Sequence, residues 1–209
     1  MHVPRAFRAE ESDVRALLEN IGAADLVTMT PEGLVGSYLP FHFRPDAGEH
    51  GTLVAHLGRG NGHWRLPVEG EALVVVHGPD AYVSPSWYAA KREHHRVVPT
   101  WNHVTAHVHG RLRIHDDPEW VEAQLRELTA RHEAESAAPW SVDDAPRRFV
   151  EGQLRAVVGL ELVISRVEAT VKMSQNRPDA DVPGIVTGLA RRGHRTAAAA
   201  VRAARRERS

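Results

Sequence analysis

The chain of 209 residues contains no cysteine, and this absence excludes several kinds of chemistry at once. Disulfide bonds, thiol nucleophiles, thiolate zinc sites and cysteine-ligated iron–sulfur clusters are all ruled out, because each of them requires the cysteine sulfur. Long apolar segments are missing too. No run approaches the roughly 18 apolar residues of a membrane-spanning helix, and the N-terminal segment lacks the apolar core of a secretory signal. We therefore expect a cytoplasmic protein.

Net charge is also nearly absent, but it is unevenly distributed along the chain. The formal net charge is −1, and residues 189–209 hold seven arginines and one glutamate, a balance of +6, so residues 1–188 carry −7. Nucleic-acid-binding proteins usually carry a basic patch on their folded surface, whereas the basic residues here gather in an Ala-rich terminal segment. Two interpretations of this tail remain open, a solvated terminal helix or an arm that contacts DNA phosphates.

A Rossmann glycine motif and regular strand–helix alternation are both missing, which argues against a doubly wound sheet. Period-two patterns instead predict strands that follow one another as a meander. We predict a mainly β (α+β) fold, an antiparallel closed barrel with peripheral helices, in residues 1–188, followed by a basic tail in 189–209. The predicted strands are 26–30, 34–43, 52–57, 71–77 (ended by Gly78-Pro79), 103–115 and 158–171, and the predicted helical segments are 12–20, 117–135, 146–157 and 182–206. The Pro-Glu-Gly turn at 31–33 predicts a hairpin of the first two strands, and Asp117-Pro118-Glu119 predicts a helix start with an N-cap and a proline in the first turn.

Residues 82–103 form an aromatic-rich segment that we predict as a loop between two strands. It contains Tyr82, Trp87, Tyr88 and Trp101. Because large rings are costly to leave in water, this loop is expected to fold against something. It either caps one end of the barrel or a subunit interface, or its rings form the wall of a site for a flat aromatic ligand, and the two interpretations are compatible.

The strand predicted at 103–115 has apolar residues at even positions and His or Arg at most odd ones. His107 and His109 share one face of it, because side chains two apart on a strand point the same way. No carboxylate lies near them in the sequence to complete a metal site, so we expect no bound metal.

Several motifs occur in one order along the chain, and together they resemble the PaiB-type FMN-binding negative transcriptional regulators, a group of flavin-binding split barrels. The Gly-rich corner among them lacks the terminal Gly-Lys-Ser/Thr of a phosphate loop. The motifs are Leu39-Pro40-Phe41, His56 to Trp64 (HLGRGNGHW), Gly78-Pro79 with Ala81 to Tyr88, Val98 to Asn102 (VPTWN) and Lys172 to Arg177 (KMSQNR).

This resemblance implies a homodimeric split barrel that binds FMN in two equivalent clefts where the subunits meet. Such a site needs cations for the phosphate, backbone groups along the edge of the ring, and apolar walls. From the motifs we expect Arg59, His56 and Lys172 at the phosphate, Leu39 and Pro40 on the strand beside the ring, and Asn61, Trp64, Trp101, Gln175 and Asn176 at the ring and ribityl chain.

The family name implies repression of transcription, and DNA contact would then use the basic tail. An alternative is an FMN-dependent oxidoreductase, a flavin reductase or oxidase acting on a small substrate. A third is a haem-binding or haem-degrading protein that uses histidine. For an enzyme, His103 with Tyr88 nearby in the sequence could orient a substrate or transfer a proton, but no acid–base pair is identifiable, so the catalytic residues are left unassigned.

Overall fold

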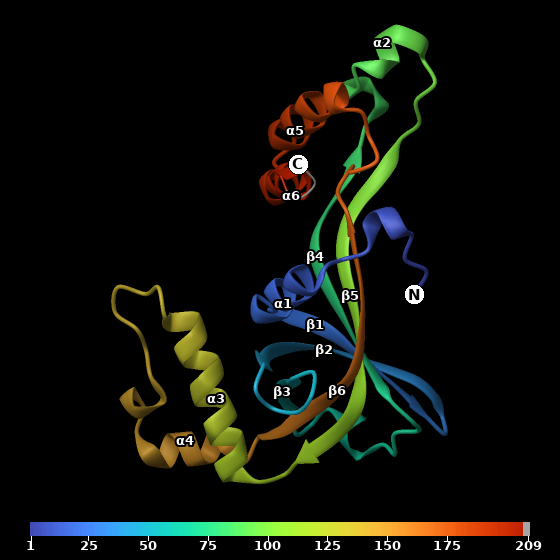
Figure 1. Cartoon of the computed structure of the whole chain (residues 1–209). Coiled ribbons are helices and arrows are strands. Elements are labelled where there is room, and N and C mark those ends of the chain that lie inside the picture. The colour runs from blue at the N-terminus through green and yellow to red at the C-terminus, as the bar shows by residue number, and fades with distance from the viewer. Residues whose placement is uncertain (207–209) are drawn as a thin grey trace. The chain divides into compact units, whose positions relative to one another are not determined.

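The computed structural model of the protein describes residues 1–206, drawn in Figure 1. The end of the predicted basic tail, residues 207–209, lies outside the described residues. The strands are β1 (Ala23–Thr30), β2 (Gly33–Arg44), β3 (Thr52–Gly58), β4 (Ala72–Val83), β5 (Thr100–His115) and β6 (Val157–Lys172). The helices are α1 (Glu11–Glu19), α2 (Ala90–His94), α3 (Pro118–Glu133), α4 (Arg147–Leu154), α5 (Val182–Arg191) and α6 (Arg195–Arg206), with 3-10 turns η1 (Arg5–Phe7), η2 (Gly62–Arg65), η3 (Pro85–Trp87), η4 (Val142–Asp144) and η5 (Asp179–Asp181).

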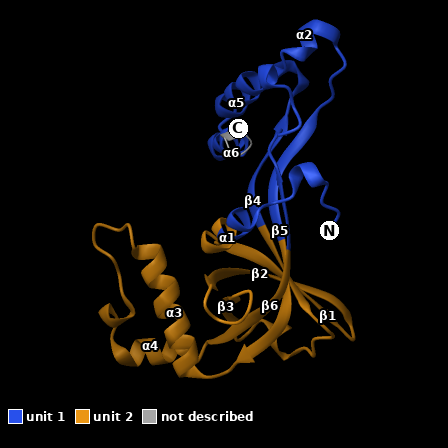
Figure 2. Cartoon of the chain, viewed as in Figure 1, with its two compact units in different colours: residues 1–15, 77–106, 168–209 blue, residues 16–76, 107–167 orange. Residues whose placement is uncertain are grey.

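The strands close into a barrel in the order β1-β2-β3-β6-β5-β4. β1 pairs antiparallel with β2 and β4, and β3 pairs antiparallel with β2 and β6. The predicted antiparallel barrel with peripheral helices is therefore confirmed. The contacts divide the chain into two compact units, coloured separately in Figure 2: unit 1 comprises residues 1–15, 77–106 and 168–209, and unit 2 comprises residues 16–76 and 107–167.

Within unit 2, the predicted hairpin of β1 and β2 forms because its sequence alternates with period two. β1 buries every second residue, and Thr30 pairs with Gly33 across the tight turn. Gly33 has φ +111, a backbone conformation that side chains rarely adopt, so the turn needs glycine there. The fully buried side chains of this unit include Leu26, Phe41, Leu53, Val54, Val74, Leu160 and Leu162.

Helix α3 begins where its capping sequence predicts. The Asp117 side chain accepts a hydrogen bond from the backbone N–H of Glu119, and Pro118 occupies the first turn. Val121 on α3 packs with Val150 and Leu154 on α4 in a small apolar cluster.

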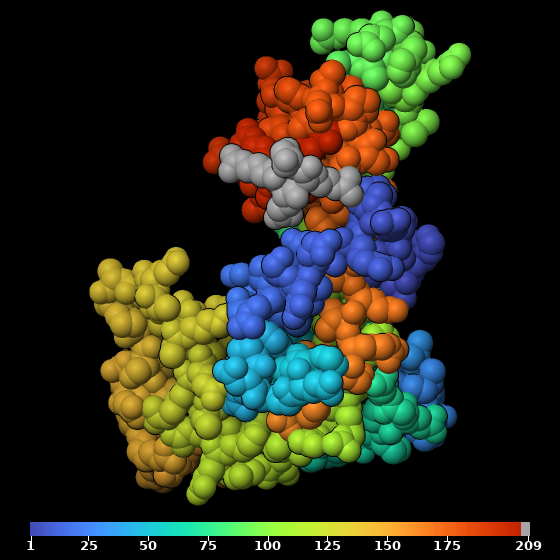
Figure 3. Space-filling model, in the orientation of Figure 1, coloured from blue at the N-terminus to red at the C-terminus, as the bar shows by residue number. Residues whose placement is uncertain are grey.

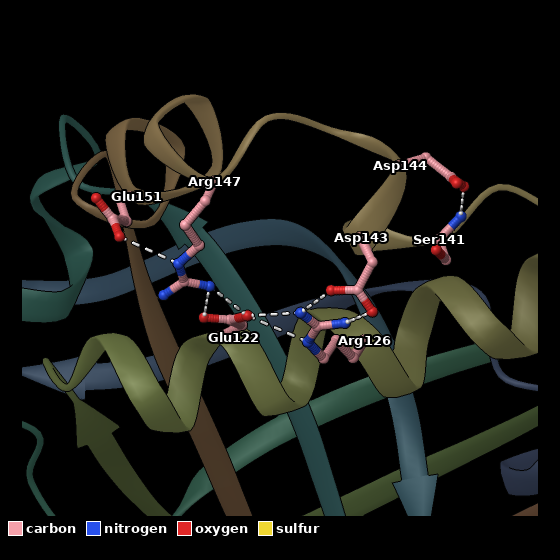
Figure 4. A network of polar contacts seen from close by, with 7 residues as sticks. All are labelled: Glu122, Arg126, Ser141, Asp143, Asp144, Arg147 and Glu151. Atoms are coloured by element: carbon pink, nitrogen blue, oxygen red, sulfur yellow. Dashed lines mark hydrogen bonds and ion pairs between the residues drawn. The ribbon is translucent and has the colours of Figure 1, made fainter.

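An ion-pair network on the surface connects α3 to α4 and to the segment between them (Figure 4). Figure 4 shows the Glu122 carboxylate between two guanidinium groups, with Arg147 Nη1 at 2.7 Å and Arg126 Nη2 at 2.8 Å. Arg126 also donates to Asp143 at 2.7 and 2.9 Å. These contacts lower the pKa of Glu122, chiefly through Arg147 and then Arg126.

Within unit 1, α5 and α6 pack against each other and against β4. In Figure 3 their atoms, orange and red, lie in contact. The buried residues of this cluster are Ala81, Val83, Tyr88, Met173, Ile185, Val186, Leu189, Ala197, Ala198, Val201 and Ala204. The Ala-rich sequence of α6 therefore contributes one face to an apolar core.

Three secondary-structure predictions need correction. β4 does not end at Gly78-Pro79 but continues to Val83. β1 pairs with β4 only from Leu73 to Val75, so the N–H that Pro79 lacks removes no hydrogen bond to β1. Residues 82–103 are not all loop, since they include η3, α2 and the start of β5. The terminal helical segment is two helices, because Gly193 has φ +85 and interrupts it.

Candidate functional site

The structure distributes the predicted flavin residues over both units. Lying in unit 2 are Leu39, Pro40, His56, Arg59, Asn61 and Trp64, whereas Trp101, Lys172, Gln175 and Asn176 lie in unit 1.

At the Gly-rich corner of unit 2, Arg59 and Trp64 are brought together. The Trp64 indole N–H donates to the Arg59 carbonyl at 3.2 Å, and the guanidinium lies 5.5 Å from the Trp64 ring centroid. The Arg59 guanidinium also donates to the Asp116 carboxylate, with Nη1–Oδ2 at 3.0 Å, and to the carbonyl of Arg155 at 2.8 Å. A phosphate at this corner would therefore share or displace Asp116, a partner that sequence spacing does not reveal.

Asn61 is used locally to shape the same corner. Its Oδ1 accepts from the backbone N–H of His63 at 3.0 Å and caps η2, and its Nδ2 donates to Ser37 Oγ at 3.2 Å. His63 is buried, and its two ring nitrogens bond to Ser37 at 2.8 Å and Thr28 at 2.7 Å. Burial lowers the pKa of His63. Sequence reasoning missed this histidine, whose signal was only its place beside Asn61.

His56 lies on β3 with its Nδ1 at 3.2 Å from the carboxamide oxygen of Gln124. Desolvation lowers the pKa of His56 below 6.5, against the smaller opposing effect of this hydrogen bond. The imidazole is therefore neutral at pH 7 and supplies no positive charge, and its one N–H, on Nδ1, is used by the Gln124 carboxamide oxygen.

Leu39 and Pro40 lie on a part of β2 that is paired on one side. Their partners on β1 are Ala24 and Ala23, whereas the pairing of β2 with β3 begins only at Phe41. The part of β2 that ends at Pro40 therefore does not pair with β3. Backbone groups on such an edge are available to the polar rim of a flat ligand.

In unit 1, Lys172 at the end of β6 retains an ammonium group without a recorded ion pair among residues 1–206. Its Nζ lies 5.9 Å from the centroid of the Phe7 ring. Lys172 is one of two lysines in the chain, and its side chain is only half-buried. Because the ammonium group still reaches solvent, an anion can bind it.

The residues after Lys172 form a tight loop held by its own polar groups. The Gln175 carboxamide accepts from the backbone N–H of Met173 and donates to the carbonyl of Val171, both at 2.6 Å. Ser174, with φ +64, exchanges hydrogen bonds with the buried side chain of Asn102. The amide of Gln175 is thus occupied within the loop.

Asn176, the next residue, is exposed. Trp101 on β5 is 54% exposed, and its indole N–H donates to Asp80 Oδ1 at 3.0 Å. Its ring meets the ring of Tyr82 edge to face, with centroids 6.3 Å apart. This pair of exposed rings on neighbouring strands is an apolar surface of the kind that a ligand or a partner covers.

Over the part of the chain that the structure describes, no three His, Asp or Glu side chains lie where they could share a metal ion. None of the described helices combines the length and the apolar content that crossing a bilayer requires.

Residues 1–166 match the model of a protein family described as "Putative FMN-binding domain". The chain belongs to this family. A relative of the chain is the protease synthase and sporulation protein PAI 2 of Bacillus subtilis (strain 168), 27% identical over 191 residues, which are 90% of this chain and 89% of that protein. The uncharacterized protein YKL070W of Saccharomyces cerevisiae is 38% identical over 120 residues, covering 56% of this chain and 70% of that one.

Solved structures share the fold of this FMN-binding family member at low sequence identity. The FAD and heme binding protein from Mycobacterium smegmatis has a TM-score of 0.58 at 18% identity, covering 88% of this chain and 80% of that chain. The flavocytochrome Anf3 from Azotobacter vinelandii has a TM-score of 0.55 at 16% identity, covering 81% and 72%. The predicted membership of the PaiB-type flavin-binding split barrels is confirmed.

Proposed function

We propose that the protein binds FMN as a homodimer of split barrels and acts as a negative transcriptional regulator of the PaiB type. The observation that carries the proposal is the match of residues 1–166 to the FMN-binding domain family. Bound FMN would supply redox chemistry that no protein side chain provides.

The side chains and backbone of the chain fit the chemistry of this cofactor. In unit 1, Lys172 has no ion pair among residues 1–206 and offers its ammonium to a phosphate. In unit 2, the β2 segment at Leu39 and Pro40 offers backbone groups to the edge of a flavin ring. Trp101 offers an exposed aromatic face. Arg59 in unit 2 already pairs with Asp116, and it would bind a phosphate as well by sharing its guanidinium between the phosphate and that carboxylate.

Exposed apolar side chains on β2 support the dimer. Leu34 and Tyr38 are each 70% exposed, and both lie on the segment that has no β3 partner. Large apolar groups at this exposure are costly in water, and a second copy of the chain would cover them. We expect Tyr38→Lys to shift the protein from dimer to monomer in sedimentation analysis, whereas a wild-type monomer would overturn the dimer.

Titration with two flavins tests the cofactor and the role of Lys172. FMN and riboflavin share the ring and ribityl chain, so the difference between their affinities isolates the phosphate contact. We expect Lys172→Gln to weaken FMN binding about tenfold or more and to leave riboflavin binding unchanged. The other lysine of the chain provides a control of equal charge, so Lys91→Gln should bind FMN as the wild type does.

Failure of the folded wild-type dimer to bind FMN would overturn the cofactor proposal. If FMN binds but Lys172→Gln has no effect, the phosphate is held elsewhere and Lys172 leaves the site. These two results are separate, because the first concerns the protein and the second a single residue.

For the regulatory role, we propose that DNA phosphates contact arginines of the basic tail. Arg195 and Arg202 on α6 are exposed, whereas Ala197 and Val201 on the same helix are buried. Removing α6 would open the apolar core of unit 1, so substitutions on its exposed face test DNA contact more cleanly. We expect Arg195→Gln with Arg202→Gln to weaken a gel shift with duplex DNA and to reduce its salt dependence. An unchanged shift would remove the tail from the DNA interface.

A further inference from the structure

Unit 1 contains a cavity of about 460 Å³ between the η3–α2 segment and α5. A volume of this size is in the range of small-molecule sites, which begin at about 300 Å³. Its wall contains an aromatic ring, two hydroxyl groups and three guanidinium groups. These side chains are Ser86, Trp87, Arg92, Thr187, Arg191 and Arg192.

Two glycines of α5 build the floor of this cavity by letting Trp87 lie directly on the helix. A Cβ on Gly184 would stand 1.9 Å from the Trp87 carbonyl oxygen, and one on Gly188 would stand 2.2 Å from Cδ2 of its ring. Any larger residue at either position would push Trp87 off the helix. The indole is therefore held in one place and gives the cavity a fixed apolar wall.

The position of α2 beside α5 is also fixed. Asp181, the residue before α5, is buried, and its Oδ1 accepts from the backbone N–H of Ala90 at 3.0 Å. This bond holds the start of α2 to the start of α5. Arg92 therefore lines the cavity from a second element, α2, whereas Arg191 and Arg192 line it from the end of α5.

The positive charges of the cavity have no carboxylate partner among the residues that the structure describes. No ion pair is recorded within residues 1–206 for Arg92, Arg191 or Arg192, and no carboxylate lines the cavity. The Arg192 guanidinium lies 5.1 Å from the centroid of the Trp87 ring, a contact that orients it without cancelling its charge. The three arginine side chains are exposed to solvent, so an anion that joins them exchanges part of their hydration for charge-assisted hydrogen bonds.

The hydroxyl groups add directed donors. Lys91 Nζ donates to Ser86 Oγ at 3.2 Å, so the Ser86 oxygen accepts there and its own O–H is left to donate. Thr187 lies one helical turn before Arg191 on α5, on the same face. Hydroxyl donors beside forked guanidinium groups match the several acceptor oxygens of a phosphate.

We propose that this cavity binds the phosphate or pyrophosphate group of a small molecule of nucleotide size. Trp87 provides the apolar wall for the remainder of that ligand, and Arg92, Arg191 and Arg192 bind the anionic group. None of the residues predicted for the flavin lines this cavity. The inference therefore concerns a second ligand and does not depend on FMN binding.

Calorimetric titration of the full chain with ADP as the probe tests this site. If the protein binds FMN, the FMN-bound form is used. Adenosine serves as the uncharged comparison. We expect ADP to bind once per chain and adenosine not to bind measurably. The double variant Arg191→Gln with Arg192→Gln should weaken ADP binding about 100-fold, and Arg92→Gln alone should weaken it about tenfold.

The matched control is Arg148→Gln, which removes the same charge from an exposed position on α4 outside the cavity. It should bind ADP as the wild type does. Thermal unfolding of each variant, compared with that of the wild type, shows whether a lost affinity reflects the site or the fold. The substituted arginines have no recorded ion pairs among the described residues, so we expect all of these variants to fold.

Three results would overturn the inference. One is that the folded wild-type protein binds neither ADP nor inorganic pyrophosphate saturably. Another is that Arg148→Gln weakens ADP binding as much as the cavity variants do, since the effect would then be general electrostatics. The last is that the cavity arginines are needed for duplex DNA and not for ADP, which would make the cavity part of a nucleic-acid surface.

Discussion

The guanidinium of Arg59 and the carboxylate of Asp116 face each other through two parallel hydrogen bonds at the Gly-rich corner of unit 2. The side chains are 34% and 49% exposed, so solvent screens the pair and it contributes little to stability. Asp116 instead decides how freely Arg59 can bind another anion. The same contact holds the pKa of Asp116 below its usual range, chiefly through the hydrogen bond from Arg59.

Opposite effects of two substitutions on FMN affinity are expected from this pair. Arg59→Ala should weaken FMN about tenfold, because it removes a charged donor from the phosphate. Asp116→Asn should leave FMN binding unchanged or strengthen it, because the guanidinium no longer has a competing carboxylate. Fluorescence quenching of FMN measures both. Equal FMN affinity in Arg59→Ala and the wild type would show that Arg59 does not bind the phosphate and only stabilises the Gly-rich corner.

The buried pair of Asn102 and Ser174 predicts a loss of stability. Asn102 is 0% exposed, and it both donates to and accepts from the Ser174 hydroxyl, at 2.9 and 3.1 Å. Asn102→Ala should lower the free energy of unfolding by about 2 kcal/mol, because it leaves that hydroxyl buried without its partner. Urea unfolding measures the change. Asn176→Ala, in the exposed part of the same loop, should change it by less than about 0.5 kcal/mol.

Gly188→Ala should destabilise unit 1, because the new methyl group would overlap the ring of Trp87. We expect a loss of about 2 kcal/mol and a change in tryptophan fluorescence. Gly152 lies in α4, and no neighbouring atom comes within 4 Å of the place a methyl group would take, so Gly152→Ala is the helical control and should stabilise by about 0.5 kcal/mol. Equal stability of Gly188→Ala and the wild type would contradict the close approach of Trp87 to α5.

Three histidines of unit 2 that are buried or half-buried predict how stability depends on pH. Desolvation lowers the pKa of His42, His56 and His63 below 6.5, and for His42 it outweighs the hydrogen bond to Glu127 at 2.8 Å. Between the lowered pKa and about 6.5 the unfolded chain binds more protons than the folded one. The contribution of these histidines to the free energy of unfolding is therefore complete above about pH 6.5, and it is lost as the pH falls below that value.

Urea unfolding from about pH 7.5 to about pH 5.5 measures this dependence, in a window above the titration of most carboxylates. His56→Gln should flatten the profile, because one of the three groups no longer titrates. A wild-type stability that stays constant or rises toward the lower pH would contradict the burial of these rings.

Local sequence patterns were sufficient for most elements of the fold. The alternation of β1 and the turn at Gly33 predicted the hairpin, and Asp117-Pro118 predicted where α3 begins. These signals are short-range, because a strand's period and a helix cap depend on residues within a few positions of each other. Pro79 misled the same reasoning, since a proline is tolerated in a strand wherever its missing N–H faces no partner.

The candidate site could be predicted only as a set of residue types. The motifs marked Arg59, Asn61 and Gln175. They did not show that Arg59 pairs with Asp116, or that the side-chain amides of Asn61 and Gln175 are used within their own turns. Nor did they show that Trp87 rests on two glycines of α5. The Arg59–Asp116 pair joins residues 57 positions apart, and Trp87 lies about a hundred positions from the glycines of α5, so no local pattern contains these two contacts.

By itself, therefore, the sequence determined the barrel, the capped helices, the family and the exclusion of cysteine chemistry, because composition, period and short motifs specify these. Only the tertiary structure decided which charges remain unpaired. Lys172 and the arginines of the α5 cavity have no recorded carboxylate partner among the described residues, whereas Arg59 has Asp116. That difference depends on which side chains the closed barrel and the packed helices bring within hydrogen-bonding distance, and it governs where an anion can bind.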